Sequence, residues 1–265
     1  MSSVSISTNN LVIGYQPVSS VSSGRQVIVQ SGLNFSLNEG ELVCMLGPNG
    51  CGKSTLLRTL AGLQPPLGGS FMLGRQKSDA PKSELSRQVA LVLTERLSMD
   101  HTTVHDVVSM GRYPYTSFLG GLTEEDERII AGSLEAVGFD LSSLNTHQSL
   151  FNAHSDGEKQ RILIAKALAQ QTPIILLDEP TAHLDLPHRI LVLRLLNRLA
   201  HEQSKTVVIS THELDLALAL SDKILLMQPS GNGHEARFYL DTPDRLRASN
   251  AFQEAFGMDI FNPLG

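Results

Sequence analysis

A glycine-rich segment near the start of the chain has the residue types and spacing of a phosphate-binding loop. The segment reads, in order, Gly47, Pro48, Asn49, Gly50, Cys51, Gly52, Lys53, Ser54 and Thr55. It fits the pattern G-x-x-x-x-G-K-[ST], it follows an apolar run at Glu41–Leu46, and it precedes a helical pattern at Ser54–Ala61. Glycines let backbone N–H groups turn toward phosphate oxygens, and the N-terminus of the following helix stabilises the negative charge. The segment is therefore the predicted binding site for nucleotide phosphates.

Three side chains of this loop invite a chemical interpretation. Lys53 is expected to reach the β- and γ-phosphates as a point charge, and the Ser54 hydroxyl suits Mg²⁺. Cys51 has two interpretations. It is either a small residue that fits the loop, or a thiol whose thiolate is favoured by the helix N-terminus and by Lys53. The second interpretation predicts a nucleotide site that is sensitive to oxidation.

Acidic residues and a histidine follow two other apolar runs. Ile174–Leu177 leads into Asp178 and Glu179, and Thr206–Ser210 is followed after one residue by His212. The strand is expected to place Asp178 near the phosphate loop, where it orients Mg²⁺ directly or through a water, while Glu179 polarises the attacking water as a general base. His212 is expected to contact the γ-phosphate or to hold the water. Ser210 also has capping-box spacing to Glu213, which indicates a structural role for that pair.

These side chains need a scaffold that brings separate segments together, and the apolar patterns predict one. Strand candidates in the first part of the chain are Gln26–Gln30, Glu41–Leu46, Ser70–Leu73 and Gln88–Leu93. Strand candidates in the last part are Ile174–Leu177, Thr206–Ser210 and Lys223–Met227, and a helical pattern covers Ile190–Leu199. Continuous apolar strands of this kind suit a parallel sheet that is covered on both faces.

Helical patterns dominate between the two groups of strands and in the tail. The segment Thr123–Val137 opens with a capping threonine and four acids at Glu124–Glu127. We interpret these acids as a solvated face that the helix dipole favours, rather than as a metal site. The tail Thr242–Phe256 is also predicted to be helical, with Thr242 as its cap and Pro243 at the first helical position.

Composition limits the class of protein. The chain has 265 residues and a mass of 28.8 kDa, which fits one or two globular domains. Lys and Arg number 21 against 27 Asp and Glu, and a net charge of −6 argues against nucleic acid as the main partner. Two cysteines, Cys44 and Cys51, are too few for a disulfide framework and indicate a reducing compartment. The N-terminus lacks a signal-peptide pattern, and no apolar run approaches the roughly 20 residues that span a bilayer, so any membrane role is expected to be peripheral.

A further motif precedes the acidic strand. It consists of His154, Ser155, Asp156, Gly157, Glu158, Lys159 and Gln160. The motif resembles the signature of ATP-binding-cassette (ABC) ATPases. The order along the chain, which is phosphate loop, helical insert, signature, acid pair and His212, is also similar to that of this family, and the resemblance covers nearly the whole chain. It implies ATP and Mg²⁺ as ligands and an α/β P-loop NTPase fold, in which a RecA-like core carries an antiparallel β-subdomain and an inserted helical subdomain. The implied single domain spans residues 1–265, with the core at 1–94 and 168–265 and the helical subdomain at 95–167.

The resemblance also implies roles for residues outside the phosphate loop. Two copies of such a chain would pair head to tail around two ATP molecules, and each ATP would touch Lys53 of one copy and Ser155 and Gly157 of the other. Tyr15 looks like the aromatic residue that stacks on adenine. Asp185 looks like the key residue of the loop that crosses the dimer.

This chain departs from the family pattern at two places. The usual Leu-Ser-Gly-Gly has His154 in place of leucine and Asp156 in place of the first glycine. The glutamine expected between the core and the helical insert is missing. Thr94 stands at the equivalent position with Glu95 as its neighbour, and either residue offers an oxygen to Mg²⁺ or water. We assign this metal-ligand role to Thr94.

The helical insert indicates what the ATPase drives. Residues Thr103–Tyr115 resemble the insert of bacterial importers for ferric siderophores, haem and cobalamin. Tyr113, Tyr115 and Phe118 crowd one loop of a chain that is only 5% aromatic, which makes the loop a candidate partner-facing surface. The expected partners are a second copy, a membrane permease on whose cytoplasmic face the homodimer docks and, indirectly, a periplasmic or surface substrate-binding protein.

Two other functions remain open from the sequence. One is a soluble ABC ATPase of an assembly system, such as one for iron–sulfur clusters. The other is an ATP-binding regulatory module without turnover, which the unusual residues His154, Asp156 and Thr94 would suit.

Overall fold

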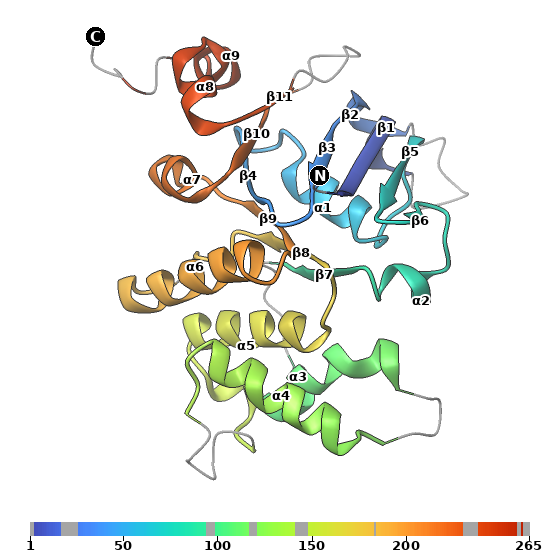
Figure 1. Cartoon of the computed structure of the whole chain (residues 1–265), viewed down its shortest axis with the longest axis vertical. Coiled ribbons are helices and arrows are strands. Elements are labelled where there is room, and N and C mark those ends of the chain that lie inside the picture. The colour runs from blue at the N-terminus through green and yellow to red at the C-terminus, as the bar shows by residue number, and fades with distance from the viewer. Residues whose placement is uncertain are drawn as a thin grey trace.

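The structure is a computed structural model, and it describes residues 3–16, 26–93, 99–116, 121–140, 148–182, 184–229, 238–258 and 261. A six-stranded sheet lies at the centre, with a second sheet on one side and a group of helices below it in the view of Figure 1. Within the described ranges, no helix is both long and apolar enough to cross a membrane.

The central sheet is parallel except at one edge. Its strands are β4 (Leu42–Leu46), β7 (Val89–Val92), β8 (Ile174–Asp178), β9 (Thr206–Ser210), β10 (Lys223–Met227) and β11 (Phe238–Asp241). They lie in the order β11-β10-β4-β9-β8-β7, and β11 alone runs antiparallel to its neighbour. Every residue of β4, β8 and β9 is buried, which is why these strands read as unbroken apolar runs. The predicted strands of the core are confirmed.

Two apolar layers cover the central sheet. Alternate residues of β4 belong to different layers: Cys44 joins one cluster and Val43 joins the other. The first cluster includes side chains of the helices α6 (Leu186–His201) and α7 (Leu214–Leu220). The second cluster includes side chains of α1 (Lys53–Leu60) and of the second sheet. The core is therefore a doubly covered sheet, as the sequence predicts.

The second sheet is antiparallel. It consists of β1 (Val4–Tyr15), β2 (Val27–Leu33), β3 (Ser36–Asn38), β5 (Gly68–Leu73) and β6 (Gln76–Lys77). Its order is β2-β1-β5-β6, and β3 also pairs with β1. The strands predicted near β2 and β5 are confirmed, whereas the long strand β1 has no counterpart in the prediction. Polar residues interrupt its apolar pattern, and Asn10 takes a positive φ of 45° next to a register shift.

The helical group lies between β7 and β8 in the sequence. It contains α3 (Val104–Ser109), the 3₁₀ segment η1 (Met110–Tyr115), α4 (Glu124–Ala136), the 3₁₀ segment η2 (Phe151–Ala153) and α5 (Asp156–Ala169). Helices α3, α4 and α5 contact one another, and α5 also contacts β7 of the core (Figure 1). The exact division at residues 95 and 167 stays a prediction.

Two helical predictions need correction. The segment after Thr123 is a helix with the predicted cap, but only part of its acidic turn is solvated, because Asp126 is buried and pairs with Arg112 at 2.7 Å. The tail is helical, but as the two short helices α8 (Pro243–Ala248) and α9 (Ala251–Phe256). Ser249 between them has an extended backbone, which ends the first helix. One more short helix, α2 (Lys82–Leu85), precedes β7.

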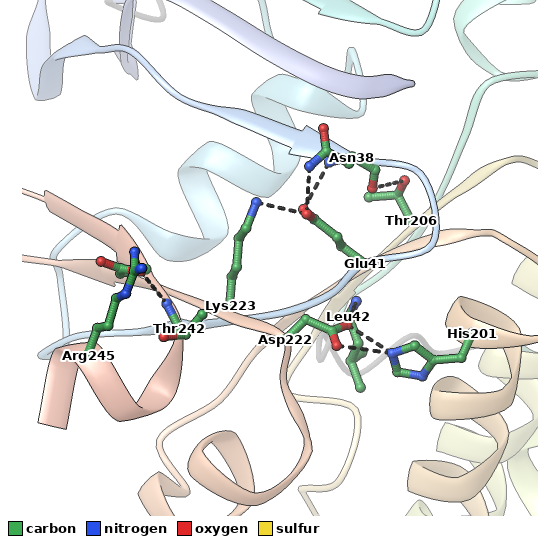
Figure 2. Close-up of polar contacts among 10 residues, drawn as sticks. Asn38, Glu41, Leu42, His201, Thr206, Asp222, Lys223, Thr242 and Arg245 are labelled. Atoms are coloured by element: carbon green, nitrogen blue, oxygen red, sulfur yellow. Dashed lines mark hydrogen bonds and ion pairs between the residues drawn. The ribbon is translucent and has the colours of Figure 1, made fainter. Parts of the chain in front are cut away.

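The amino ends of the central strands are joined by partly buried and exposed polar contacts (Figure 2). The carboxylate of Asp222 accepts a hydrogen bond from the backbone N–H of Leu42 at 2.8 Å, at the first residue of β4. The same carboxylate lies 3.0 Å from Nε2 of His201 at the end of α6. Asp222 therefore ties the start of the strand that leads to the phosphate loop to the helix that covers it.

A second contact lies beside it in Figure 2. The Glu41 carboxylate accepts hydrogen bonds from the backbone and side-chain nitrogens of Asn38 at 2.9 and 2.7 Å and from Lys223 Nζ at 2.8 Å. Burial raises the pKa of Glu41, but the hydrogen bonds from Asn38 and Lys223 outweigh this effect and the net pKa is lowered. Glu41 therefore stays ionised and links the two sheets at this end.

We expect Asp222→Ala to lower the free energy of unfolding by about 1–3 kcal/mol, because the buried N–H of Leu42 loses its acceptor. Urea denaturation of the full chain measures the change. Asp222→Asn is the matched control, because its amide oxygen still accepts from Leu42 and less stability should be lost. Equal losses for the two variants would contradict the capping role.

Candidate active site

The predicted phosphate loop connects β4 to α1, and its shape depends on glycine. Gly47 and Gly52 have φ values of +150° and +103°. A Cβ atom at Gly47 would lie 2.3 Å from the carbonyl oxygen of Met227, and one at Gly52 would lie 2.8 Å from Cγ1 of Val29. Helix α1 begins directly after Gly52, which offers no side-chain cap to its first N–H groups. The loop thus presents free backbone donors in the way an anion site requires.

Lys53 lies across this loop. Its Nζ donates hydrogen bonds to the carbonyl oxygens of Gly47 at 2.7 Å and Pro48 at 3.3 Å, and the residue is buried. Ser54 next to it is exposed. The ammonium group therefore sits where the loop closes, and the next residue along the chain is open to solvent.

Cys51 is buried behind the loop. Burial raises the pKa of its thiol, and the nearby ammonium of Lys53 opposes this effect without reversing it. The hypothesis of a reactive thiolate is therefore wrong, and the structure favours the interpretation of Cys51 as a small residue that fits.

Tyr15 lies at the end of β1, next to the first turn of α1. Its hydroxyl is 3.0 Å from Oγ1 of Thr55, and half of the residue remains exposed, with a relative exposure of 52%. An exposed aromatic ring beside a phosphate loop can stack against a planar base.

The acid pair lies at the carboxyl end of β8. Asp178 is buried and accepts a short hydrogen bond from Ser210 Oγ on the neighbouring strand β9. Glu179 has a positive φ of 47°, and its backbone N–H is held by the carbonyl and hydroxyl oxygens of Ser210 at 3.0 and 3.1 Å. Such a strained backbone at a non-glycine residue is typical of functional sites.

His212 completes this group. Its Nδ1 lies 2.9 Å from Oε1 of Glu179, and the imidazole is exposed while the carboxylate is partly buried. The contact gives Glu179 a fixed direction at the mouth of the site. The arrangement can hold a water for attack on a nearby phosphate.

Strand register brings these pieces to one edge of the sheet. Met45 on β4 and Asp178 on β8 both lie opposite Ser210 on β9. Because all three strands are parallel, the phosphate loop, the acid pair and His212 leave the sheet at the same end. The structure therefore brings together the predicted residues from Gly47 to Thr55, Asp178, Glu179 and His212.

Three other predicted residues, Ser155, Gly157 and Asp185, line a separate hollow of ≈ 640 Å³. Among the described residues, none from the phosphate loop lines it. Ser155 caps α5 in a reciprocal capping box with Glu158, as predicted, and Asp185 caps α6 by accepting from the His188 N–H at 3.1 Å.

Asp156 is the first residue of α5, and its carboxylate lies near a lysine of the same helix. Its carboxylate lies 3.9 Å from Nζ of Lys159, which is one turn further along α5. The acid that replaces the usual glycine of the signature therefore has a cation close by, and the two charges offset each other in part.

Some predicted residues lie outside the part that the structure describes, namely Thr94, Glu95 and Phe118. Within the described part, no group of three or more His, Cys, Asp and Glu residues could hold a metal ion. The hydroxyl of Ser54 and the carboxylate of Asp178 are nevertheless hard oxygen donors of the kind that Mg²⁺ prefers.

Ser210 has a role that the sequence reasoning missed. The predicted capping box with Glu213 is wrong, because Ser210 Oγ is engaged with Asp178 and Glu179, while Glu213 bonds Thr181 and Arg189 at 3.2 and 3.0 Å. A hydroxyl residue at the end of a buried strand, in register with an acid, is the signal that could have identified it.

The Gly-Arg-Tyr-Pro run of the insert is largely structural. Gly111 approaches α5 so closely that a Cβ would lie 2.3 Å from the Lys166 carbonyl oxygen. Arg112 donates to the carbonyl of Ala169 at 2.8 Å and lies over the ring of Tyr115, whose hydroxyl donates to the Gln170 carbonyl at 2.9 Å. Only Tyr113 is largely free, with a relative exposure of 63%.

Comparisons with known proteins agree with this geometry. Residues 30–182 match the family model described as ABC transporter. The iron(3+)-hydroxamate import ATP-binding protein FhuC of Bacillus subtilis (strain 168) is 37% identical over 225 residues, which cover 84% of this chain and 79% of FhuC. Among solved structures, an ABC transporter in an inward-facing conformation has a TM-score of 0.77 at 30% identity, covering 96% of this chain and 89% of that chain. A dimeric ATP-binding cassette in a post-hydrolysis state with ADP and Pi has a TM-score of 0.71 at 28% identity. The match covers 83% of this chain and 93% of that cassette.

The pairing of Asp126 with Thr123 and Arg112 predicts a pH dependence of stability. Hydrogen bonds from the Thr123 hydroxyl and N–H, and then from Arg112, lower the pKa of Asp126 from 3.8 to about 2. The stabilisation is therefore complete above pH 3.8 and is lost as the pH falls toward 2. We expect Asp126→Asn to lower the free energy of unfolding by about 1–3 kcal/mol at neutral pH.

Urea denaturation at a series of pH values tests this expectation. The difference between Asp126→Asn and the unchanged chain should shrink below pH 3.8. Glu124→Gln, in the same helical turn but exposed, is the control and should change little. A difference that stays constant over this range would rule out the charged form of Asp126 as its source.

Proposed function

Because the chain belongs to the ABC transporter family, we propose that it is the ATP-hydrolysing subunit of a bacterial importer that takes up an iron–siderophore complex, haem or cobalamin. The observation that carries the proposal is the meeting of the phosphate loop, Asp178, Glu179 and His212 at one edge of a parallel sheet. The name of the relative FhuC, an iron(3+)-hydroxamate import protein, supports the class of cargo.

ATP would bind with its phosphates in the loop and its base on Tyr15. The backbone donors around Gly47–Gly52 and the first turn of α1 would surround the phosphates, and Lys53 would exchange its carbonyl partners for phosphate oxygens. The position of Tyr15 beside Thr55 supports stacking on adenine at the outer end of the same site.

Mg²⁺ fits the oxygen donors available here. Ser54 and Asp178 would hold it, with Thr94 as a third donor from outside the described residues. When bound, the ion neutralises charge on the transferring phosphoryl group. The bond from Ser210 keeps the Asp178 carboxylate oriented for this role.

Hydrolysis would proceed by attack of water on the γ-phosphate. Glu179 accepts the proton of the water as general base. Its left-handed backbone and the two hydrogen bonds from its N–H to Ser210 fix the position from which its side chain extends. His212, 2.9 Å from that carboxylate, orients it and contacts the γ-phosphate.

A second copy of the chain would complete each site. Ser155, Gly157 and Asp185 share a hollow to which the chain's own phosphate loop does not contribute among the described residues. Placing the N-terminus of α5 against the γ-phosphate held by another copy would stabilise its negative charge. ATP would then hold two copies together, and hydrolysis would release them.

A permease segment would dock on the groove between the core and the helical group. This groove has a volume of ≈ 350 Å³ and a largely apolar lining that includes Leu63, Leu85 and Leu163. Lys166 also lines it, and burial lowers the pKa of its amine. A short apolar helix on the cytoplasmic side of a permease suits this surface, which would make the subunit peripheral to the inner membrane. A substrate-binding protein would deliver the cargo to the other side of the permease.

We expect Glu179→Gln to bind ATP but to reduce turnover by at least about 100-fold, because the amide cannot accept the proton. The variant should also accumulate as an ATP-bound dimer, which size-exclusion chromatography with ATP and Mg²⁺ measures. Glu202→Gln is the matched control and should turn over normally, because this exposed residue follows α6 and precedes β9, at the opposite end of the sheet from the site. Wild-type turnover by Glu179→Gln would remove the assignment of the base.

Docking on the groove predicts a separable loss of coupling. Leu63→Glu should abolish copurification with the permease, because it places a charge on an apolar surface, while the ATPase activity of the isolated chain stays unchanged. Met258→Glu is the matched control, since Met258 and Leu63 have similar relative exposures of 60% and 59%. If no permease copurifies with the unchanged chain from its native membranes, a soluble assembly ATPase is favoured instead.

A further inference from the structure

A buried glutamine of the antiparallel sheet holds the back of the phosphate loop. Gln30 lies on β2 and has a relative exposure of only 1%. Its Nε2 donates hydrogen bonds to the carbonyl oxygen of Cys51 at 2.8 Å and to that of Gln228 at 2.6 Å. Both acceptors are carbonyl oxygens, so only the amide nitrogen, with its two hydrogens, can make these contacts. One side chain thus joins β2, the loop and the end of β10.

The stem of Gln30 packs against Gly52 beside apolar side chains. Cγ of Gln30 lies beside Gly52 together with side-chain carbons of Val29 and Ile13, all within 3.5 Å of the place where a Cβ at Gly52 would be. A buried amide in such surroundings is unfavourable unless it is hydrogen-bonded, and an aliphatic side chain would fill the space at less risk. The polar group is therefore best explained by the two carbonyl oxygens that it binds.

The bond to Cys51 fixes the direction of a neighbouring donor. The peptide unit between Cys51 and Gly52 is planar and trans, so its C=O and N–H groups point in opposite directions. Because Gln30 holds the carbonyl oxygen on the side of β2, the N–H of Gly52 points to the opposite side of the loop. Gly52 is also the residue that precedes α1, where free N–H groups face the anion site.

We propose that Gln30 is a positioning residue for the phosphates of ATP, acting through the Cys51–Gly52 peptide. This inference rests on the proposed nucleotide site. The amide keeps the Gly52 N–H directed at the phosphates, and its second bond, to the carbonyl of Gln228, ties that orientation to the end of β10. Gly47 at the other end of the loop also lies against β10, at the carbonyl of Met227. Both ends of the loop are thus positioned against the carboxyl end of β10, one directly and the other through Gln30.

The test compares ATP hydrolysis by the full chain and by Gln30→Met, which keeps the volume of the side chain and removes both donors. The KM for ATP with Mg²⁺ should rise about tenfold while kcat changes by less than about twofold, because a contact to bound phosphate acts equally on the ground state and the transition state. Thr8→Val is the matched control: it removes a buried hydrogen bond to Phe35 from the same sheet without touching the loop. Its KM should remain at the wild-type value.

A second variant keeps the inference testable if Gln30→Met does not fold. In Gln30→Glu, burial next to two carbonyl oxygens raises the pKa of the new carboxyl, so its acid form donates one hydrogen bond. Its KM should be intermediate at neutral pH and should rise relative to wild type as the pH is raised and the carboxyl ionises.

The outcomes separate the inference from the proposed function. If the unchanged chain neither binds nor hydrolyses ATP, the proposed function fails. If it does both, and Gln30→Met has the wild-type KM or Thr8→Val raises KM as much, the inference is overturned. A KM of Gln30→Glu that parallels wild type at all pH values would overturn it as well.

Discussion

The parallel register of β4, β9 and β8 determines what this molecule can do. Ser210 lies opposite both Met45 and Asp178, so segments that are far apart in sequence leave the sheet side by side. A slip of one residue would turn Asp178 toward the other face of the sheet. The register is secured because alternate residues of each strand belong to two different apolar layers, and both layers would be disrupted by such a slip.

Much of this scaffold could be predicted because its strands are buried on both faces. The predicted limits of β9 and β10 agree residue for residue with the structure, and β8 differs by one residue. Such strands appear in the sequence as apolar runs, and polar turn residues mark where each run ends. The strand β1 was not predicted because Asn9 and Asn10 interrupt its alternation of apolar and polar residues. A single sequence does not show that an irregularity in the strand pairing accommodates these two residues.

The candidate site was predictable to the extent that its residues belong to local motifs. The phosphate loop, the acid pair and His212 each follow a strand, and the sheet places them together. Contacts between distant segments were not predictable in this way. Nothing near Gln30 in the sequence indicates that its amide meets the carbonyl of Cys51, and Asp126 reads as one more solvated acid until Arg112 is placed beside it. The roles assigned to Ser155, Gly157, Asp185 and Thr94 remain proposals, as do the subdomain limits.

The hydrogen bonds of Lys53 to the carbonyls of Gly47 and Pro48 have a thermodynamic consequence. An anion that enters the loop must compete with oxygens that already solvate this ammonium group. What the lysine adds to affinity is the difference between two sets of partners rather than the whole of a new ion pair. Its removal would also leave the carbonyl oxygens of Gly47 and Pro48 without the cation that they share, so a neutral residue at this position would alter the loop itself as well as its affinity for an anion.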